Sequence, residues 1–148
     1  MLPIIQIHAK LFVAQSGVDR KRSQKSMLWF LEALCQHNSL WLDLYDTPLL
    51  YDTDIRYLAE PPNREHWQDI PTCIERKTGD CEDLSCYRVG ELRHAGIMAH
   101  PYIKWRLVNG SHRYHCLVQW PDGRIEDPSI ALGMAGPMYR KPIFLNEV

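Results

Sequence analysis

The sequence predicts one domain of the α+β class, in which helices come first along the chain and an antiparallel sheet follows. Apolar residues recur at helical spacing over about 21–36 and 81–94. The pattern over 97–127 is instead strand-like, and the turn sequences NGS (109–111) and PDG (121–123) interrupt it. Helices and strands that are segregated in this way are typical of α+β proteins. A chain of 148 residues with 45% hydrophobic and 24% charged residues fits one globular domain, residues 1–148.

The N-terminal half is predicted to hold one helix, over about residues 21–36. Residues 2–14 precede it as a strand or extended arm, and Ser16, Gly17 and Asp19 mark a turn. One face of the helix carries Met27, Phe30, Leu31 and Leu34. His37 and Asn38 are its expected end. Residues 39–70 keep no period, so we expect short strands and loops there, closed by Pro61 and Pro62.

A second helix is predicted over about residues 81–94. Asp80 is a suitable N-cap, and Asp83 three residues later makes a variant of the capping box. Gly96 is a natural residue at the position after the C-cap. This helix places Cys81 in its first turn.

The sheet is predicted from the strand-like segments that follow. Residues 97–108 and 112–120 form a hairpin around NGS, and PDG leads into a short strand over 124–127. Pro128 ends that strand, and the tail over 136–148 supplies one more edge strand.

The charge balance excludes some classes of partner. Lys and Arg total 17 and Asp and Glu total 18, so a net charge of −1 gives no electrostatic reason to expect nucleic acid or an anionic membrane. The basic run over 19–25 is interpreted as a solvated helix face. No signal peptide or apolar stretch of about 20 residues is visible. Five cysteines, an odd number, predict reduced thiols in a cytoplasmic protein.

Three residues have the chemistry of a nucleophilic site. The helix dipole favours an anion at Cys81, His115 can accept its proton, and Asp127 can orient that histidine. Twelve residues around a tight turn separate His115 from Asp127, so the two can lie side by side on adjacent strands. Asp80, Glu82 and Asp83, however, disfavour a thiolate at Cys81. These residues alone leave Cys81 open as a nucleophile, a metal ligand or a small apolar filler.

The segments GDCEDLS, HCLVQWPDGR and EDPS, in this order, resemble the transglutaminase-like superfamily of papain-like fold. The Gly-Asp-Cys-Glu-Asp start of the helix, and the approach HWQDIPTCIERKT before it, are most similar to the bacterial transglutaminase-like cysteine peptidases. The resemblance covers about residues 65–130. It implies Cys81 as nucleophile, His115 as general base and then acid, and Asp127 as orienting carboxylate. The implied reaction is acyl transfer through a thioester on a peptide or protein amide, with water (protease, amidase or deamidase) or an amine (transamidase) as acceptor.

The resemblance also implies an oxyanion hole and a metal. The backbone N–H of Cys81 would be one oxyanion donor, and Trp67 or Gln68 the second. Carboxylates beside the cysteine help to bind calcium in the most similar branch, and Asp80 and Glu82 offer the oxygen ligands that calcium prefers. No other cofactor is required. The same acids are equally explained as first-turn residues that complement the helix dipole.

Several alternatives to this interpretation are left open by the sequence. Cys81 can be a buried structural cysteine, which is the expected role of Cys35, Cys73, Cys86 and Cys116. His112 can replace His115, but residues three apart on a strand face opposite sides, and the family pattern favours His115. Zinc is disfavoured because no CxxC pair is present. A catalytically inactive binding module or virion-associated structural part, in a phage-encoded protein, is the non-enzymatic alternative.

Overall fold

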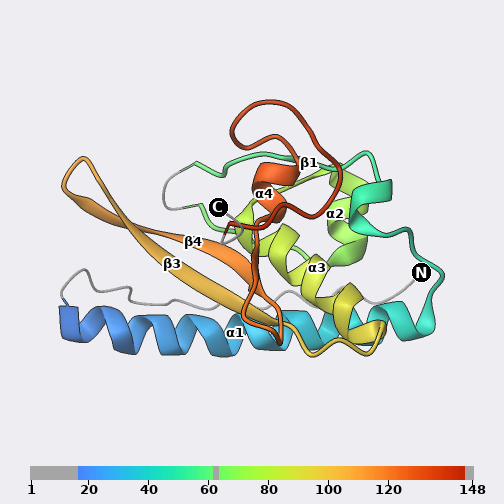
Figure 1. Cartoon of the computed structure of the whole chain (residues 1–148), viewed down its shortest axis with the longest axis horizontal. Helices are drawn as coiled ribbons and strands as arrows, with labels where there is room; N and C mark the ends of the chain where they lie inside the picture. Colours follow the sequence, from blue (N-terminus) through green and yellow to red (C-terminus); the bar gives the residue numbers. More distant parts are fainter. Residues whose placement is uncertain (1–16, 62–63, 146–148) are drawn as a thin grey trace.

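The computed structural model describes residues 17–61 and 64–145, and it has the mixed α+β composition that the sequence predicts. The long helix α1 runs along the base of the molecule, with the β3–β4 hairpin over one half of it and α3 over the other (Figure 1). In chain order the elements are α1 (Gly17–Leu44), the 3-10 turn η1 (Leu50–Asp52), β1 (Arg56–Tyr57), α2 (Ile70–Arg76), β2 (Thr78–Gly79), α3 (Cys81–His94), β3 (His100–Val108), β4 (Ser111–Gln119), β5 (Ile125–Glu126) and α4 (Pro128–Ala131).

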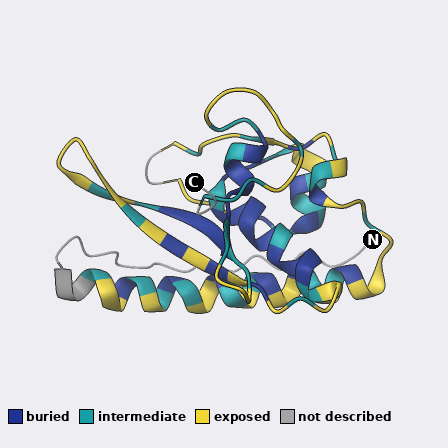
Figure 2. Cartoon of the chain, in the orientation of Figure 1, coloured by how far each residue is buried: buried dark blue, intermediate teal, exposed yellow. Residues whose placement is uncertain are grey.

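Helix α3 has the predicted bounds and the predicted capping box. The Asp80 side chain accepts from the Asp83 backbone N–H, and the Asp83 side chain accepts from the Asp80 backbone N–H. Gly96 follows the C-cap with a φ of 86°, a conformation that favours glycine. Most of α3 is buried between α1, the sheet and α4, which makes it the centre of the core (Figure 2).

Helix α1 is longer at both ends than predicted. The turn expected at Gly17 and Asp19 is helical, and His37 and Asn38 do not end the helix, which continues to Leu44. Contacts with α2 and α3 explain the extension. Asn38 is fully buried, and its Oδ1 accepts a hydrogen bond from the Ile70 backbone N–H at 3.1 Å. A Cβ at Gly90 would lie only 2.8 Å from the Asn38 Cβ, so the two helices approach closely at this point.

The sheet forms around the predicted hairpin. Asn109 (φ 50°) and Gly110 (φ 76°) make its two-residue turn, and the β3–β4 register runs from the pair His100–Gln119 to the pair Val108–Ser111. β5 pairs with the end of β4 through Val118 and Glu126, giving the antiparallel order β3-β4-β5. One face of this sheet packs against α1 and α3; we call it the core face. The opposite face carries His115 and is called the outer face.

Other elements differ from the prediction in detail. Helices α2 and α4 were not predicted, although Asp69 and Asp127 are N-caps followed by prolines. β1 and β2 form a small parallel pair. The tail contributes one bridge, Phe144 to Glu126, beside β5. The strand or extended arm predicted over 2–14 lies outside the described residues. Within the described residues no helix combines the length and apolar character needed to cross a membrane.

Candidate active site

His115 and Asp127 form a buried pair, as predicted, although the strand predicted over 124–127 ends at Glu126 and Asp127 begins α4 as its N-cap. The His115 Nε2 lies 2.9 Å from the Asp127 Oδ2, and their side chains are only 8% and 0% exposed. Asp127 is also the N-cap of α4, where its Oδ1 accepts from the backbone N–H groups of Ser129 and Ile130. The carboxylate is therefore held from both sides, and it fixes the orientation of the imidazole. Among the residues that the structure describes, the His115 Nδ1 has no hydrogen-bond partner, so this nitrogen is the one left to exchange a proton.

Cys81 lies at the edge of β4, next to His115 along the strand. Ser85, one turn further along α3, donates its hydroxyl to the Cys116 carbonyl at 3.0 Å. The Cys116 backbone N–H lies near the Cys81 sulfur, where it lowers the pKa of the thiol. The start of α3 thus covers the part of the β4 edge that β5 leaves free. This contact brings the sulfur beside the peptide bond that joins His115 to Cys116.

The Cys81 thiol is nevertheless paired with a carboxylate. It donates to the Glu82 Oε2 at 3.0 Å, and within 17–61 and 64–145 no hydrogen bond joins it to His115. Glu82 is 2% exposed, and its Oε1 accepts from the Tyr114 hydroxyl. Burial and then the charge of Glu82 raise the pKa of the Cys81 thiol well above its ordinary value, while the Cys116 N–H acts in the opposite direction. In this arrangement the thiol is protonated.

Glu82 belongs to a cluster of acids at the start of α3. Burial, with the neighbouring charges of Asp83 and Glu82, raises the pKa of Asp80 to about 11. Burial opposes ionisation of Glu82 too, but hydrogen bonds from Asp80, Tyr114 and Cys81 outweigh it, and the pKa of Glu82 is lowered. Asp80 therefore holds a proton and donates it to Glu82, so the cluster lowers its own repulsion by sharing protons.

Asp80 could hold a cation together with two acids from an earlier segment of the chain. Glu60, Glu65 and Asp80 each offer an oxygen, and the three atoms lie within 4.8 Å of one another. An all-carboxylate donor set suits calcium. Of the pair predicted from the sequence, Asp80 belongs to this group, whereas the oxygens of Glu82 face Cys81, Tyr114 and Asp80. Sequence reasoning missed Glu60 and Glu65, because nothing in their own segment marks them apart from their charge.

The oxyanion candidates have different surroundings. The capping box occupies the backbone N–H groups of Asp80 and Asp83 and does not involve that of Cys81. The Gln68 side-chain amide is committed elsewhere, because its Nε2 donates to the Asp83 Oδ2 at 2.8 Å. Trp67 is half-buried against the same core cluster as Cys81, and among the described residues its indole N–H has no hydrogen-bond partner. Among the described residues, the Cys81 N–H and the Trp67 indole N–H are therefore the candidates that are not committed to another partner.

The side chains of His112 and of the other four cysteines do not join this site. His112 pairs in register with Leu107 on the core face, opposite to His115, and its ring contacts Arg20 at 3.0 Å. Cys35, Cys73, Cys86 and Cys116 are free thiols and are fully buried. Cys81 is the partly exposed one.

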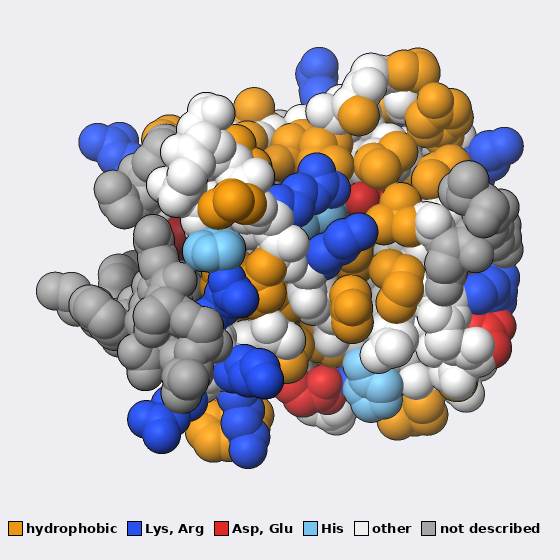
Figure 3. Space-filling view, turned by 60° about the vertical axis from the view of Figure 1, so that its left-hand side comes forward, with side chains coloured by type: hydrophobic (Ala, Val, Ile, Leu, Met, Phe, Trp, Pro, Cys, Tyr) orange, Lys and Arg blue, Asp and Glu red, His pale blue; other side chains and the backbone are white. Residues whose placement is uncertain are grey.

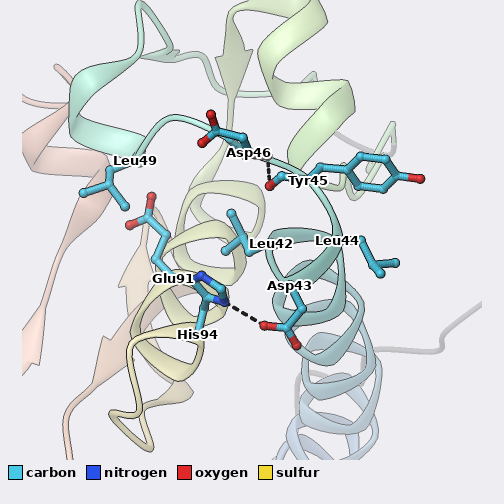
Figure 4. Close-up of a pocket in the computed structure, with 9 residues that line it drawn as sticks. Leu42, Asp43, Leu44, Tyr45, Asp46, Leu49, Glu91 and His94 are labelled. Atoms are coloured by element: carbon cyan, nitrogen blue, oxygen red, sulfur yellow. Dashed lines mark hydrogen bonds and ion pairs between the residues drawn. The ribbon is translucent and has the colours of Figure 1, made fainter.

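A hollow in the surface lies away from these residues. It measures about 280 Å³ and is formed by the end of α1, the loop after it, and Glu91 and His94 near the end of α3 (Figure 4). The His94 Nδ1 lies 2.6 Å from the Asp43 Oδ1 at its rim. Cys81 is at the other end of α3, ten residues from Glu91, which corresponds to about 15 Å along a helix. This hollow therefore does not serve the Cys81 site.

The chain matches no family model, no curated protein and no solved structure to which it was compared.

Proposed function

We propose that this protein catalyses thiol-dependent acyl transfer on a peptide or protein amide, with Cys81, His115 and Asp127 in a papain-like arrangement. The buried 2.9 Å contact between His115 and Asp127, beside the sulfur of Cys81 at the β4 edge, is the observation that carries the proposal. An imidazole that is oriented by a carboxylate and lies next to a cysteine at a helix N-terminus is the arrangement that nucleophilic thiol catalysis requires.

The geometry supports the following roles in the proposed reaction. The His115 Nδ1 accepts the thiol proton, and Asp127 stabilises the imidazolium that forms. The sulfur attacks the carbonyl carbon, and the N–H groups of Cys81 and Trp67 donate to the developing oxyanion. His115 then gives its proton to the leaving amine, which leaves a thioester on Cys81. Water or a second amine takes the acyl group and releases the enzyme.

Before the reaction, the Cys81 thiol must give up its hydrogen bond to Glu82 and form one with His115. Rotation about χ1 changes the direction of a thiol in the first turn of a helix, and we propose that such a rotation turns the Cys81 sulfur from Glu82 towards His115. A cation held by Glu60, Glu65 and Asp80 would supply positive charge close to Glu82 and would favour the thiolate. We include calcium in the proposal as the ion that this donor set fits best.

Alkylation kinetics test the proposal. Because the other four cysteines are buried, iodoacetamide should modify Cys81 first in any case, so selectivity alone decides nothing. The informative quantity is the rate at Cys81 between pH 6 and 9, measured by peptide mass spectrometry. We expect His115→Ala to slow the reaction at pH 7 about 10-fold or more and Asp127→Asn to slow it less, because thiolate formation depends on the imidazole. His112→Ala is the matched control. Equal rates in wild type and His115→Ala across this pH range refute the triad.

One observation favours a non-enzymatic alternative, a binding module or structural part in which the fold is kept and catalysis is absent. The Cys81 thiol is hydrogen-bonded to Glu82, and its pKa is raised. A protein of this kind would show slow alkylation of Cys81 at pH 7 and no dependence on His115.

A further inference from the structure

The outer face of the β3–β4 hairpin carries a regular row of side chains on both sides of His115. In the register of the two strands, Lys104 lies opposite His115 and Arg106 lies opposite Arg113. Tyr102 lies opposite Leu117 in the other direction. Directly opposed residues in an antiparallel pair project from the same face. The row therefore passes from apolar side chains, through the lysine and histidine, to two arginines.

The cations in this row are not neutralised by the described part of the chain. Lys104, Arg106 and Arg113 are all exposed, and none makes an ion pair within residues 17–61 and 64–145. Like charges directly opposite on neighbouring strands destabilise a sheet, as Arg106 and Arg113 are here. Figure 3 brings this end of the molecule forward; several separate Lys and Arg side chains lie there among hydrophobic ones, and few acidic side chains are visible. An anionic partner would remove this repulsion.

The other end of the row contains an apolar hollow. It measures about 180 Å³ and is lined by Tyr102, Lys104, Leu117, Ile125 and Leu145. Leu117 is two residues from His115 and four from Arg113 on the same strand, which corresponds to about 7 and 13 Å. Alternate side chains of an extended peptide have the same spacing. Leu117 and His115 are themselves buried, so a peptide would lie over the exposed side chains of the hairpin. It can place an apolar side chain in the hollow beside Tyr102 and two acidic ones beside Lys104 and the arginine pair.

We infer that the outer face beside His115 binds an extended acidic peptide, with an apolar residue in the hollow and carboxylates on Lys104, Arg106 and Arg113. That such a peptide is a substrate rests on the proposed acyl transfer, because the row passes His115. That the surface binds such a peptide does not depend on the proposed acyl transfer. The hollow and the strand-like spacing match the side chains of a peptide, whereas a nucleic acid would use the cations alone.

Fluorescence anisotropy tests the inference without requiring turnover. The probes are labelled peptides that contain Leu-Ser-Glu-Ser-Glu or its reverse, neutral Leu-Ser-Gln-Ser-Gln counterparts, and a labelled ten-nucleotide oligothymidylate. The protein is the full chain with Cys81→Ala, so that no probe is consumed. Arg106→Gln with Arg113→Gln is the test variant, and Arg22→Gln with Lys25→Gln, exposed cations on α1, is the matched control. Thermal melting confirms that each variant is folded.

We expect a Glu peptide to bind at 50 mM salt and the Gln peptides to bind at least 5-fold more weakly. The affinity of the Arg106/Arg113 variant for the Glu peptide should be about 5- to 10-fold lower, which is the loss expected for two exposed ion pairs. The affinity of the Arg22/Lys25 control variant should fall less than 2-fold. Binding should weaken at 300 mM salt. Equal binding of Glu and Gln peptides, or an unchanged affinity in the test variant, overturns the inference. Tighter binding of the oligothymidylate also overturns it, since the surface would then suit nucleic acid. If the Glu peptide binds but wild type neither cleaves nor transfers it, the docking surface is supported and only the acyl-transfer proposal fails for this peptide.

Discussion

Replacing Glu82 with glutamine should make the Cys81 thiol more reactive, because Glu82 is the charge closest to the sulfur. The Glu82 Oε2 lies 3.0 Å from the Cys81 Sγ, and the carboxylate is buried. A negative charge at this position disfavours a second one on sulfur. Glutamine keeps the size of the side chain and an oxygen for the Tyr114 hydroxyl, but it removes the charge.

The magnitude follows from the distance. Two unit charges 3.0 Å apart interact by about 5.5 kcal/mol at an effective dielectric constant of ~20, which equals about 4 pKa units. Cys81 is partly exposed, so water reduces this value, and we expect the thiol pKa to fall by ~2 units. Below its pKa the thiolate fraction rises 10-fold per unit, while nucleophilicity falls with a Brønsted coefficient of about 0.45. The expected gain in alkylation rate at pH 7 is therefore ~10-fold.

The assay is the rate of iodoacetamide modification at Cys81 under pseudo-first-order conditions, from pH 6 to 9. Glu91→Gln is the matched control, because Glu91 is also a buried carboxylate of α3 but lies near its other end. It should leave the rate unchanged. A Glu82→Gln protein that melts like wild type and reacts within 2-fold of it refutes the assignment of Glu82 as the residue that suppresses the thiolate.

Three further predictions concern stability and the acid cluster. Gly90→Ala should lower the free energy of unfolding by about 1–2 kcal/mol in urea titration, because the added Cβ meets Asn38. This clash outweighs the ~1 kcal/mol gained from the better helix propensity of alanine. An unchanged urea midpoint contradicts the close approach of the two helices. Burial raises the pKa values of Asp83 and Glu91 to about 7, so the folded state binds more protons than the unfolded state above about pH 4. Stability from these groups is lost as pH rises through about 7, and the melting temperature without divalent cations should be at least ~2 °C higher at pH 5.5 than at pH 8; the opposite slope contradicts these shifts. Calcium at 1 mM should raise the melting temperature at pH 8 and speed alkylation of Cys81, and Glu65→Gln should abolish both effects; identical responses in wild type and variant exclude Glu65 as a ligand.

Local signals in the sequence were enough to predict the elements that carry the candidate triad. Asp80 and Asp83 cap each other within one turn, so the start of α3, and with it the position of Cys81, depends on residues only three apart. Asn109 and Gly110 set the hairpin register because a two-residue turn of this kind aligns both strands. The side-by-side placement of His115 and Asp127 follows from that hairpin and the PDG turn.

The surroundings of the thiol could not be predicted in the same way. Glu60 and Glu65 reach Asp80 from a segment without periodicity, and Tyr114 reaches Glu82 from the middle of a strand. The extension of α1 past His37 depends on Asn38 meeting Gly90, two residues that are 52 positions apart in the chain. Such contacts depend on how whole elements pack.

The sequence by itself determined that this chain is an α+β protein with a capped helix starting at Cys81 and with His115 and Asp127 side by side, although Asp127 follows the last strand instead of lying in it. Caps and tight turns act over a few residues, so their chemistry is visible in the order of amino acids. Only the tertiary structure decided that the thiol pairs with Glu82, that Glu60 and Glu65 join the acids at the start of α3, and that a row of cations flanks His115 on the outer face. Desolvation and charge–charge interactions act through space, and they depend on which distant segments are brought together.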